Sequence, residues 1–284
     1  MLEMIASFLP HLVLLGIVSS ILLALFDAKF SIIGMVLTLI AATPFLTFSQ
    51  FLSPTEAECP PTNCLTVITA NVFARTEATI DLLELAEVEG ADVVAMNESI
   101  NLILASEYRP SFAAYETVIH AAWENMPRHM GNPITLSTNQ PLRFQDRVLR
   151  YDTGGRAYII ADLDGDWSGT RLVAAHAMTP VSRTGLRTRN ALLSAAGEAA
   201  AESDSFILMG DFNLTPWTPA FRKLPGKRAG DPRFTSTWPV ALGPFGIPID
   251  HIMFSDDLEL VEFKPLEPDI SDHYPILARF RRKD

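Results

Sequence analysis

The chain has 284 residues, of which 48% are hydrophobic, and a formal net charge of −11 at pH 7. This length allows one ordinary domain and an additional segment. Because an acidic surface repels phosphate backbones, the composition argues against binding of nucleic acid through a basic surface, but a metal site stays compatible with it.

The first 52 residues form two long uncharged runs, 4–26 and 30–51, separated by a short charged segment. Each run exceeds the ~20 apolar residues that a helix needs to cross a bilayer. A cleaved signal peptide followed by a core helix is the alternative, but no basic region precedes the first run, and two long runs occur instead of one short run. We therefore predict a transmembrane helical hairpin at residues 1–52 and a linker at residues 53–64. Two helices beside a large polar domain give little support to a transporter or channel subunit.

The charges around the two runs predict the orientation of the hairpin. Lys29, between the runs, is the only Lys or Arg before Arg75. The positive-inside tendency places this loop in the cytoplasm and the following domain on the other side. Glu56 and Glu58 follow the second run with no basic residue nearby, which agrees with this orientation. The sequence thus predicts a protein of the inner (cell) membrane with an extracytoplasmic domain.

Cys59 and Cys64 are the only cysteines, and both lie at the end of the linker. Turn-forming Pro and Asn residues separate them, so the pair could close a small disulfide in an oxidising compartment. The alternative is two unpaired thiols. A zinc site is not favoured, because there is no further Cys and no His lies close in the sequence.

Residues 65–284 have the pattern of a mixed α+β layered domain, because predicted strands outnumber the helices inserted between them. Apolar spacing predicts an amphipathic helix at residues 76–88 and a second helix at residues 187–202. Residues 102–141 give no clear pattern. The predicted strands are residues 65–70, 91–96, 156–163, 171–175, 206–209, 249–254 and 276–280.

Polar residues recur at the carboxyl ends of these strands, where a rigid sheet can hold them for chemistry. In the segment Gly210-Asp211-Phe212-Asn213, the Asp and Asn side chains can point into the same cleft. The alternative is an ordinary β-turn, since Gly, Asp and Asn are turn formers. The other polar strand ends are Asn71, Glu98 and His176.

Two Asp-His pairs, Asp250-His251 and Asp272-His273, flank the last predicted strands. One such pair alone is more often a surface feature. Glu98 supplies a hard oxygen ligand of the kind that Mg²⁺ or Mn²⁺ prefers, although a solvated acid at a strand end is the plainer interpretation of that residue alone.

Taken in order, these elements resemble the endonuclease/exonuclease/phosphatase (deoxyribonuclease-I-like) superfamily, and the chain resembles a membrane-anchored member of bacterial type. The resemblance covers roughly residues 64–282. It implies a four-layer α/β sandwich of two packed mixed β-sheets flanked by helices, so that residues 65–284 form the catalytic domain. It also implies Mg²⁺ (or Mn²⁺) as cofactor, with Asn71, Glu98 and Asp272 as the metal-binding residues.

The resemblance implies a role for each remaining motif residue. His273 would act as general acid/base, with Asp250 holding its imidazole tautomer. Asp211 would position or deprotonate the attacking water. Asn213 and His176 would donate hydrogen bonds to the phosphate. No covalent intermediate is required, so the expected reaction is in-line attack by water.

One feature of the family pattern is missing. Nuclease members often carry a further acid that partners the second histidine, and here Glu107, Glu116 and Glu124 are candidates outside any alignable motif. His251 is interpreted as a strand residue. Arg187 and Arg189 could approach a substrate phosphate, but the favoured interpretation is a structural role at a helix start. Trp238 could stack on a base or pack a lid, and the favoured interpretation is packing in the core.

The sequence therefore predicts a membrane-anchored, metal-dependent phosphoesterase that hydrolyses a phosphodiester or phosphomonoester. Nucleic acid and phospholipid-like substrates are both compatible with it, the membrane is the second predicted partner, and no protein partner is indicated. The alternative is a catalytically silent membrane-bound binding module, which should have lost one or more motif residues. All of them are present.

Overall fold

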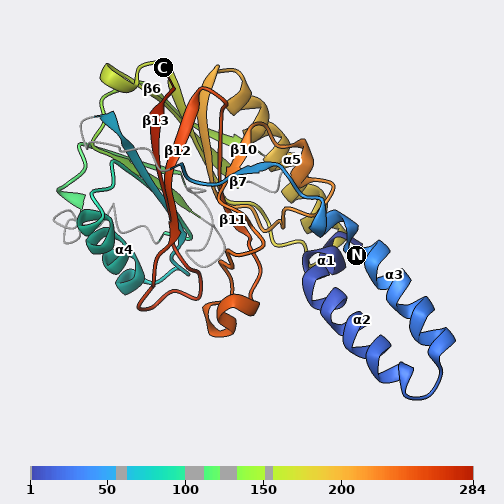
Figure 1. Cartoon of the computed structure of the whole chain (residues 1–284). Helices are drawn as coiled ribbons and strands as arrows, with labels where there is room; N and C mark the ends of the chain where they lie inside the picture. The colour runs from blue at the N-terminus through green and yellow to red at the C-terminus, as the bar shows by residue number, and fades with distance from the viewer. Residues whose placement is uncertain (1, 56–62, 100–111, 122–132, 151–155, 284) are drawn as a thin grey trace.

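Two β-sheets packed face to face form the body of the protein, and a helical hairpin projects from one side of it (Figure 1). The computed structural model describes residues 2–55, 63–99, 112–121, 133–150 and 156–283. The predicted four-layer α/β sandwich is confirmed within these residues.

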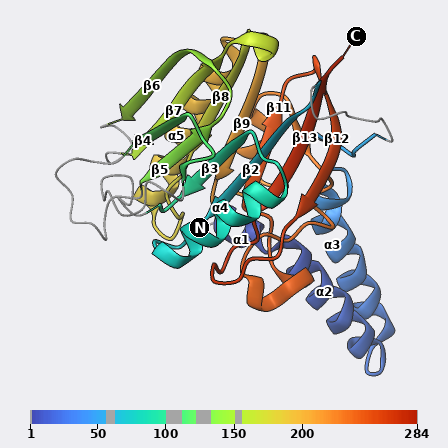
Figure 2. The ribbon, with the colours of Figure 1, turned by 90° about the vertical axis from the view of Figure 1, so that its left-hand side faces the viewer.

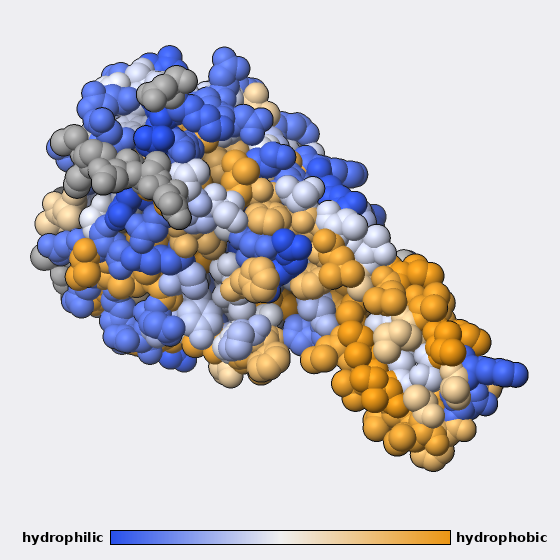
Figure 3. Space-filling view, in the orientation of Figure 1, coloured by the Kyte–Doolittle hydropathy of each residue, from blue (hydrophilic) through white to orange (hydrophobic). Residues whose placement is uncertain are grey.

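The hairpin consists of α1 (Leu2–Ser7), α2 (Leu9–Ala24) and α3 (Ala28–Leu46). The carboxylate of Asp27 caps α3 by accepting a hydrogen bond of 2.8 Å from the backbone N–H of Lys29. Most large apolar side chains of α2 and α3 are exposed, and Figure 3 shows a nearly continuous hydrophobic surface there. Among the described helices, α3 alone is long and apolar enough to cross a bilayer, whereas α2 is apolar but has 16 residues.

The chain passes between the two sheets three times: β1 belongs to the first sheet, β2–β5 to the second, β6–β11 to the first and β12–β13 to the second. The first has the order β1-β10-β11-β9-β8-β7-β6 and the second β12-β13-β2-β3-β5-β4. In the first sheet the strands are β1 (Phe51–Leu52), β6 (Leu142–Arg150), β7 (Arg156–Leu163), β8 (Thr170–Ala175), β9 (Ser205–Asp211), β10 (Lys227–Ala229) and β11 (Asp250–Phe254). In the second they are β2 (Leu65–Asn71), β3 (Val93–Asn97), β4 (Thr117–Ala121), β5 (Ile134–Thr138), β12 (Leu258–Pro265) and β13 (Ile276–Arg282).

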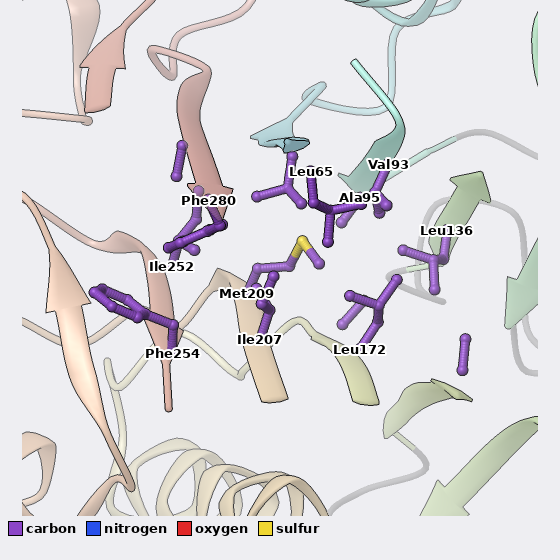
Figure 4. Close-up of a cluster of buried hydrophobic side chains, with 14 of the residues drawn as sticks. Leu65, Val93, Ala95, Leu136, Leu172, Ile207, Met209, Ile252, Phe254 and Phe280 are labelled. Carbon is purple, nitrogen blue, oxygen red and sulfur yellow. The ribbon is translucent and has the colours of Figure 1, made fainter. Parts of the chain in front are cut away.

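Apolar side chains of both sheets interdigitate in a central core, part of which Figure 4 shows. Leu65 and Val93 from one sheet face Leu172 and Ile207 from the other, and all four are fully buried. Helix α5 (Arg183–Ala201) covers the outer face of the first sheet and α4 (Thr76–Val88) covers that of the second (Figure 2). The central strands are therefore buried on both faces, which explains their nearly continuous apolar sequences.

Several strands have no clear signal in the sequence. Strand β6 is an edge strand rich in charged residues, and β4 and β5 lie in the region that gave no pattern. Short 3₁₀ helices complete the chain: η5 (Gly165–Trp167), η6 (Phe221–Lys223) and η7 (Val240–Phe245).

The hairpin is packed firmly against the sandwich. Phe48, just after α3, is buried beside Phe221, and β1 pairs in parallel with β10. The indole N–H of Trp217 donates to the carbonyl of Ser7 in α1 at 3.3 Å. The hairpin and the sandwich therefore share one packed interface.

An ion pair within this interface joins helix α1 of the hairpin to helix α5 of the sandwich. The guanidinium of Arg189, on α5, is fully buried and pairs with the carboxylate of Glu3, on α1. A second guanidinium nitrogen donates to the carbonyl of Asn213 at 3.0 Å. Burial lowers the pKa of Arg189 and the charge of Glu3 opposes that shift, so Glu3 helps to keep this buried cation charged.

We expect the substitution Glu3→Gln to lower the free energy of unfolding by about 3 kcal/mol, because it leaves a buried charge without its counter-ion. Denaturant unfolding of the solubilised full chain measures this. The matched control is Glu202→Gln, which removes a carboxylate that is 71% exposed in its pair with Arg171. That control should change stability by less than about 1 kcal/mol. Equal effects of the two substitutions would contradict the prediction.

Candidate active site

The predicted site residues converge at one edge of the sandwich, where strands of the two sheets end side by side. The amide of Asn71, at the end of β2, donates to the carboxylate of Asp211, at the end of β9, with a distance of 3.1 Å. The side chain of Asn97 also bridges the sheets, because it accepts from the Asp211 N–H and donates to the carbonyl of Ala175. Residues far apart in the chain therefore meet in one cluster.

Gly210 permits the close approach of strands that places Asp211. Its φ is +138°, and a Cβ atom there would lie 2.0 Å from the carbonyl oxygen of Ala175. A larger residue would force β8 and β9 apart. The glycine before Asp211 in the motif is thus required by the backbone.

Asp211 is buried and has several hydrogen-bond donors. Besides Asn71, it accepts from the backbone N–H of Asn213 at 2.8 Å and from the amide of Asn213 at 3.2 Å. Burial alone would raise its pKa, but the adjacent imidazole of His176, the positive charge of His273 and the backbone N–H of Asn213 outweigh burial and lower the pKa to about 2. Asp211 is therefore a carboxylate at neutral pH.

His273 and Asp250 form a buried pair. The Nδ1 atom of His273 lies 2.8 Å from a carboxylate oxygen of Asp250. Burial would lower the pKa of His273, but the charge and hydrogen bond of Asp250 raise it to about 9. The backbone N–H of Asp250 donates to the hydroxyl of Thr237, which fixes the acid in place. Because Nδ1 is engaged, the Nε2–H of the imidazolium is the one available to a substrate.

Glu98 is the more exposed acid of the cluster. It follows β3 with a φ of +55°, and its side chain is 28% exposed. One carboxylate oxygen accepts from the amide of Asn71 at 3.2 Å and lies 3.7 Å from Nε2 of His176. A partly exposed carboxylate held beside other acids is suited to a hard divalent cation.

Asp272 lies in the loop before β13, which is tied to the site by Ser271. The hydroxyl of Ser271 donates to the carbonyl of Asn71 at 2.6 Å. One oxygen of Asp272 accepts from the indole N–H of Trp238 at 3.0 Å, and the other is buried without a hydrogen-bond partner among the described residues. Trp238 is partly exposed and its ring lies 6.3 Å from that of His273, so its interpretation as a core residue is wrong.

His176 is buried at the end of the first sheet's β8. Its Nε2 lies 3.6 Å from Asp211, and its Nδ1 has no hydrogen-bond partner within the described part of the chain. Of the acids considered as its partner, Glu116 is exposed, and Glu107 and Glu124 lie outside the described residues.

The structure tests the interpretations given to His251 and Arg189. His251 is buried in β11, accepts from Arg228 at Nδ1 over 2.9 Å and contacts the Leu214 carbonyl through Nε2, so it is the strand residue that was predicted. Arg189 lies within α5 and not at its start, because the helix begins at Arg183.

Sequence reasoning missed Arg156. This residue begins β7, and the pairing of Tyr158 with Ala175 places it beside the end of β8, where its guanidinium donates to the sulfur of Met178 at 3.0 Å. Burial lowers the pKa of Arg156, while the negative charges of Asp211 and Glu98 oppose that shift. A lone arginine at the start of a strand is the only signal in the sequence, and it gains meaning only when the strand pairing is known.

The chemistry of the donors fits a divalent metal. Ligand atoms of Asp211, Asp250 and His273 all lie within 4.8 Å of one another. In that group, however, the imidazole and Asp250 already bond to each other, and a cation there would have to break the bond. Glu98 and Asp272 are free of that conflict, and Asp272 has an unpartnered oxygen.

The sequence of this domain is similar to that of a known protein family. Residues 68–273 match a family model described as the Endonuclease/Exonuclease/phosphatase family. No curated protein matches the chain.

Solved structures share the fold at low sequence identity. An endonuclease/exonuclease/phosphatase from Beutenbergia cavernae has 16% identity and a TM-score of 0.63 over 78% of this chain and 72% of its own. TDP2 from D. rerio, complexed with a single-strand DNA product, has 15% identity and a TM-score of 0.60 over 77% of this chain and 99% of its own. The 3′ phosphatase NExo from Neisseria, bound to a product DNA hairpin, has 16% identity and a TM-score of 0.54 over 75% and 98%.

Proposed function

Because the chain belongs to the endonuclease/exonuclease/phosphatase family, we propose that it is a membrane-anchored hydrolase that cleaves a phosphodiester or phosphomonoester with Mg²⁺ or Mn²⁺. The observation that carries this proposal is the convergence of Asn71, Glu98 and His176 on Asp211, with the Asp250–His273 pair at the same edge. A silent binding module would have no need to keep these side chains in contact.

Glu98 and Asp272 would hold the metal, and Asn71 would fix the Glu98 carboxylate through its amide. When bound, the metal would polarise a phosphoryl oxygen and offset the negative charge that builds up during hydrolysis. The oxygen of Asn71 already accepts from the backbone N–H of Phe73, so its amide nitrogen is the part that faces the acids.

Asp211 would orient the attacking water and accept its proton. Its low pKa keeps it ionised, and its donors hold the carboxylate in one direction. Both hydrogens of the Asn213 amide are engaged, by Asp211 and by the carbonyl of Ala177. A hydrogen bond from Asn213 to a phosphate oxygen would therefore replace one of these contacts.

The cationic groups would bind the phosphate and assist departure of the leaving group. His273 would donate its Nε2–H, while Asp250 keeps the imidazole oriented. His176 lies between the two acids Glu98 and Asp211, where its imidazole would contact a phosphate oxygen. Arg156 would add a second positive charge on the same side.

The hairpin would anchor the enzyme in the inner membrane with its catalytic domain outside the cytoplasm. The exposed apolar faces of α2 and α3 support insertion, and Lys29 at the distal turn supports this orientation. Cys64 is disulfide-bonded, which is compatible with an oxidising compartment, while Cys59 lies outside the described residues.

Two substrate classes have support. The neighbours from D. rerio and Neisseria carry DNA products, which favours nucleic acid. The acidic composition and the hairpin favour a phosphoester at the membrane, because tethering raises the effective concentration of the site there.

Removal of divalent metal tests the proposal. The full chain in nanodiscs should hydrolyse bis-para-nitrophenyl phosphate with Mg²⁺ or Mn²⁺, lose at least about 99% of its turnover with chelator, and regain it when metal is restored. Plasmid DNA and phospholipid substrates assayed in parallel separate the two classes. Turnover that persists unchanged in chelator would overturn the metal-dependent mechanism. The full chain is needed because Phe48 and β1 belong to the packed domain.

A further inference from the structure

An uncharged segment of the catalytic domain lies against the base of the hairpin. Residues 239–249 contain no charged side chain and include η7. Leu242 is 51% exposed and Phe245 is 64% exposed, although both are large and apolar. In a chain with 19% charged residues, the exposed apolar side chains of this uncharged segment indicate a partner that covers them.

This segment is bonded to the hairpin. Nε2 of His11, near the start of α2, lies 2.6 Å from the carbonyl oxygen of Phe245. A cavity of about 140 Å³ between them is lined by Pro10 and Phe45 from the hairpin and by Pro244 from the segment. The exposed apolar surface therefore continues from the hairpin onto η7.

The contact with His11 also determines where η7 lies along the length of the hairpin, and so how deep it would lie in a bilayer. Helix α2 runs away from the sandwich, so His11 lies near the end closest to the catalytic domain (Figures 1 and 2). In a hairpin that crosses a bilayer, this end lies at the boundary between acyl chains and head groups. The contact between His11 and Phe245 places η7 at this end of the hairpin.

The same segment is attached directly to the active site. The backbone N–H of Val240 donates to the carbonyl of Asp272 at 2.9 Å, and the hydroxyl of Tyr274 donates to the carbonyl of Val240. Trp238, two residues earlier, contacts the Asp272 carboxylate. A surface that holds η7 would therefore lie next to the loop that carries Asp272 and His273.

We propose that η7 is a second bilayer contact, in which Leu242 and Phe245 enter the lipid boundary and hold the rim of the active site among the head groups. The partner is the lipid surface, because the exposed apolar side chains of η7 adjoin the hairpin and residues 239–249 themselves carry no charge. Arg233, which also lines the cavity between them, is paired with Asp231. The site then takes phosphoesters that membrane lipids present in their head groups. This inference rests on the proposed function, since it requires the hairpin to be inserted.

Fluorescence quenching in nanodiscs tests the contact. Single cysteines at Leu242, Val88 and Ile21 are labelled with bimane under non-reducing conditions, and the lipids carry nitroxide at a shallow or deep acyl position. Val88 is the matched control, because it is 83% exposed but lies at the end of α4, whereas Ile21 is an exposed residue of α2. We expect quenching at Ile21 by the deep probe and at Leu242 by the shallow probe, with none at Val88.

The outcomes separate this inference from the anchor. Quenching at Ile21 with none at Leu242 overturns the second contact and leaves the hairpin inserted. The absence of quenching at both positions overturns the membrane anchor. If Leu242 is quenched in discs that hold two protein copies but not in discs that hold one, the exposed face of η7 contacts another protein copy. That result would also overturn the inference.

Activity on two substrates provides the second readout. The double variant Leu242→Glu with Phe245→Glu should lose about tenfold in turnover of a lipid phosphoester in the disc, relative to bis-para-nitrophenyl phosphate. Turnover of the soluble substrate should stay within about twofold of the unmodified chain, as for the control Val88→Glu. Equal losses on both substrates, or none on the lipid, would overturn the inference. If the unmodified chain hydrolyses neither substrate, the proposed function itself is contradicted.

Discussion

Substitution of His273 by alanine is expected to lower kcat by about 10²–10⁴-fold, because it removes the general acid of the proposed reaction. The imidazole is held by Asp250 at 2.8 Å, and its pKa of about 9 keeps it protonated at neutral pH. Metal-dependent turnover of bis-para-nitrophenyl phosphate by the full chain in nanodiscs measures the loss.

A double-mutant cycle with Asp250→Ala shows whether the two residues act as one unit. If Asp250 acts through His273, the double variant should lose little more kcat than His273→Ala alone. Losses that multiply would mean that Asp250 contributes separately. A kcat that His273→Ala leaves unchanged, in a variant that still unfolds cooperatively, would refute the role of the histidine.

The substitution Asp211→Asn should lower kcat by a similar factor of about 10²–10⁴, although it preserves the shape of the side chain. An amide at this position cannot accept a proton from water. It would also place an NH₂ group among donors from Asn71 and Asn213, which now point at the carboxylate. The loss should appear in kcat with every metal tested, because the proposed ligands Glu98 and Asp272 are untouched.

Asp162→Asn is the matched control for this substitution. Asp162 is also a buried aspartate, but it pairs with Arg171 on β8, away from the reaction centre. We expect Asp162→Asn to reduce stability while kcat changes by less than about threefold. Comparable losses of kcat in the two variants would show that Asp211 acts through stability and not through chemistry.

The parts of the site that could be predicted from sequence are those marked by short motifs next to buried strands. Gly210 and Asp211 follow an apolar strand, and the steric need for glycine there is local to two adjacent strands. Asp272 and His273 lie in the loop just before another apolar strand, β13. Because strand ends meet at one sheet edge, such motifs predict where each residue lies and which other motif residues lie close to it.

Other features depend on contacts between distant segments, and no local pattern marks them. Trp238 faces the site because its loop turns back to Asp272, 34 residues further on. Arg156 acquires its charged neighbours only through the pairing of β7 with β8. Strand β6 lies at an edge and carries charges on a surface that packing does not constrain, so it lacks a clear hydrophobic period.

The pairing of Glu3 with Arg189 has a consequence for how the enzyme can be distributed in a cell. A protease that cut after the hairpin would remove the counter-ion of a buried guanidinium that is itself bonded to the carbonyl of Asn213. It would also strip Phe48 and β1 from the domain. We therefore expect shedding to yield a damaged fragment and not a diffusible hydrolase, with activity only where the intact chain resides.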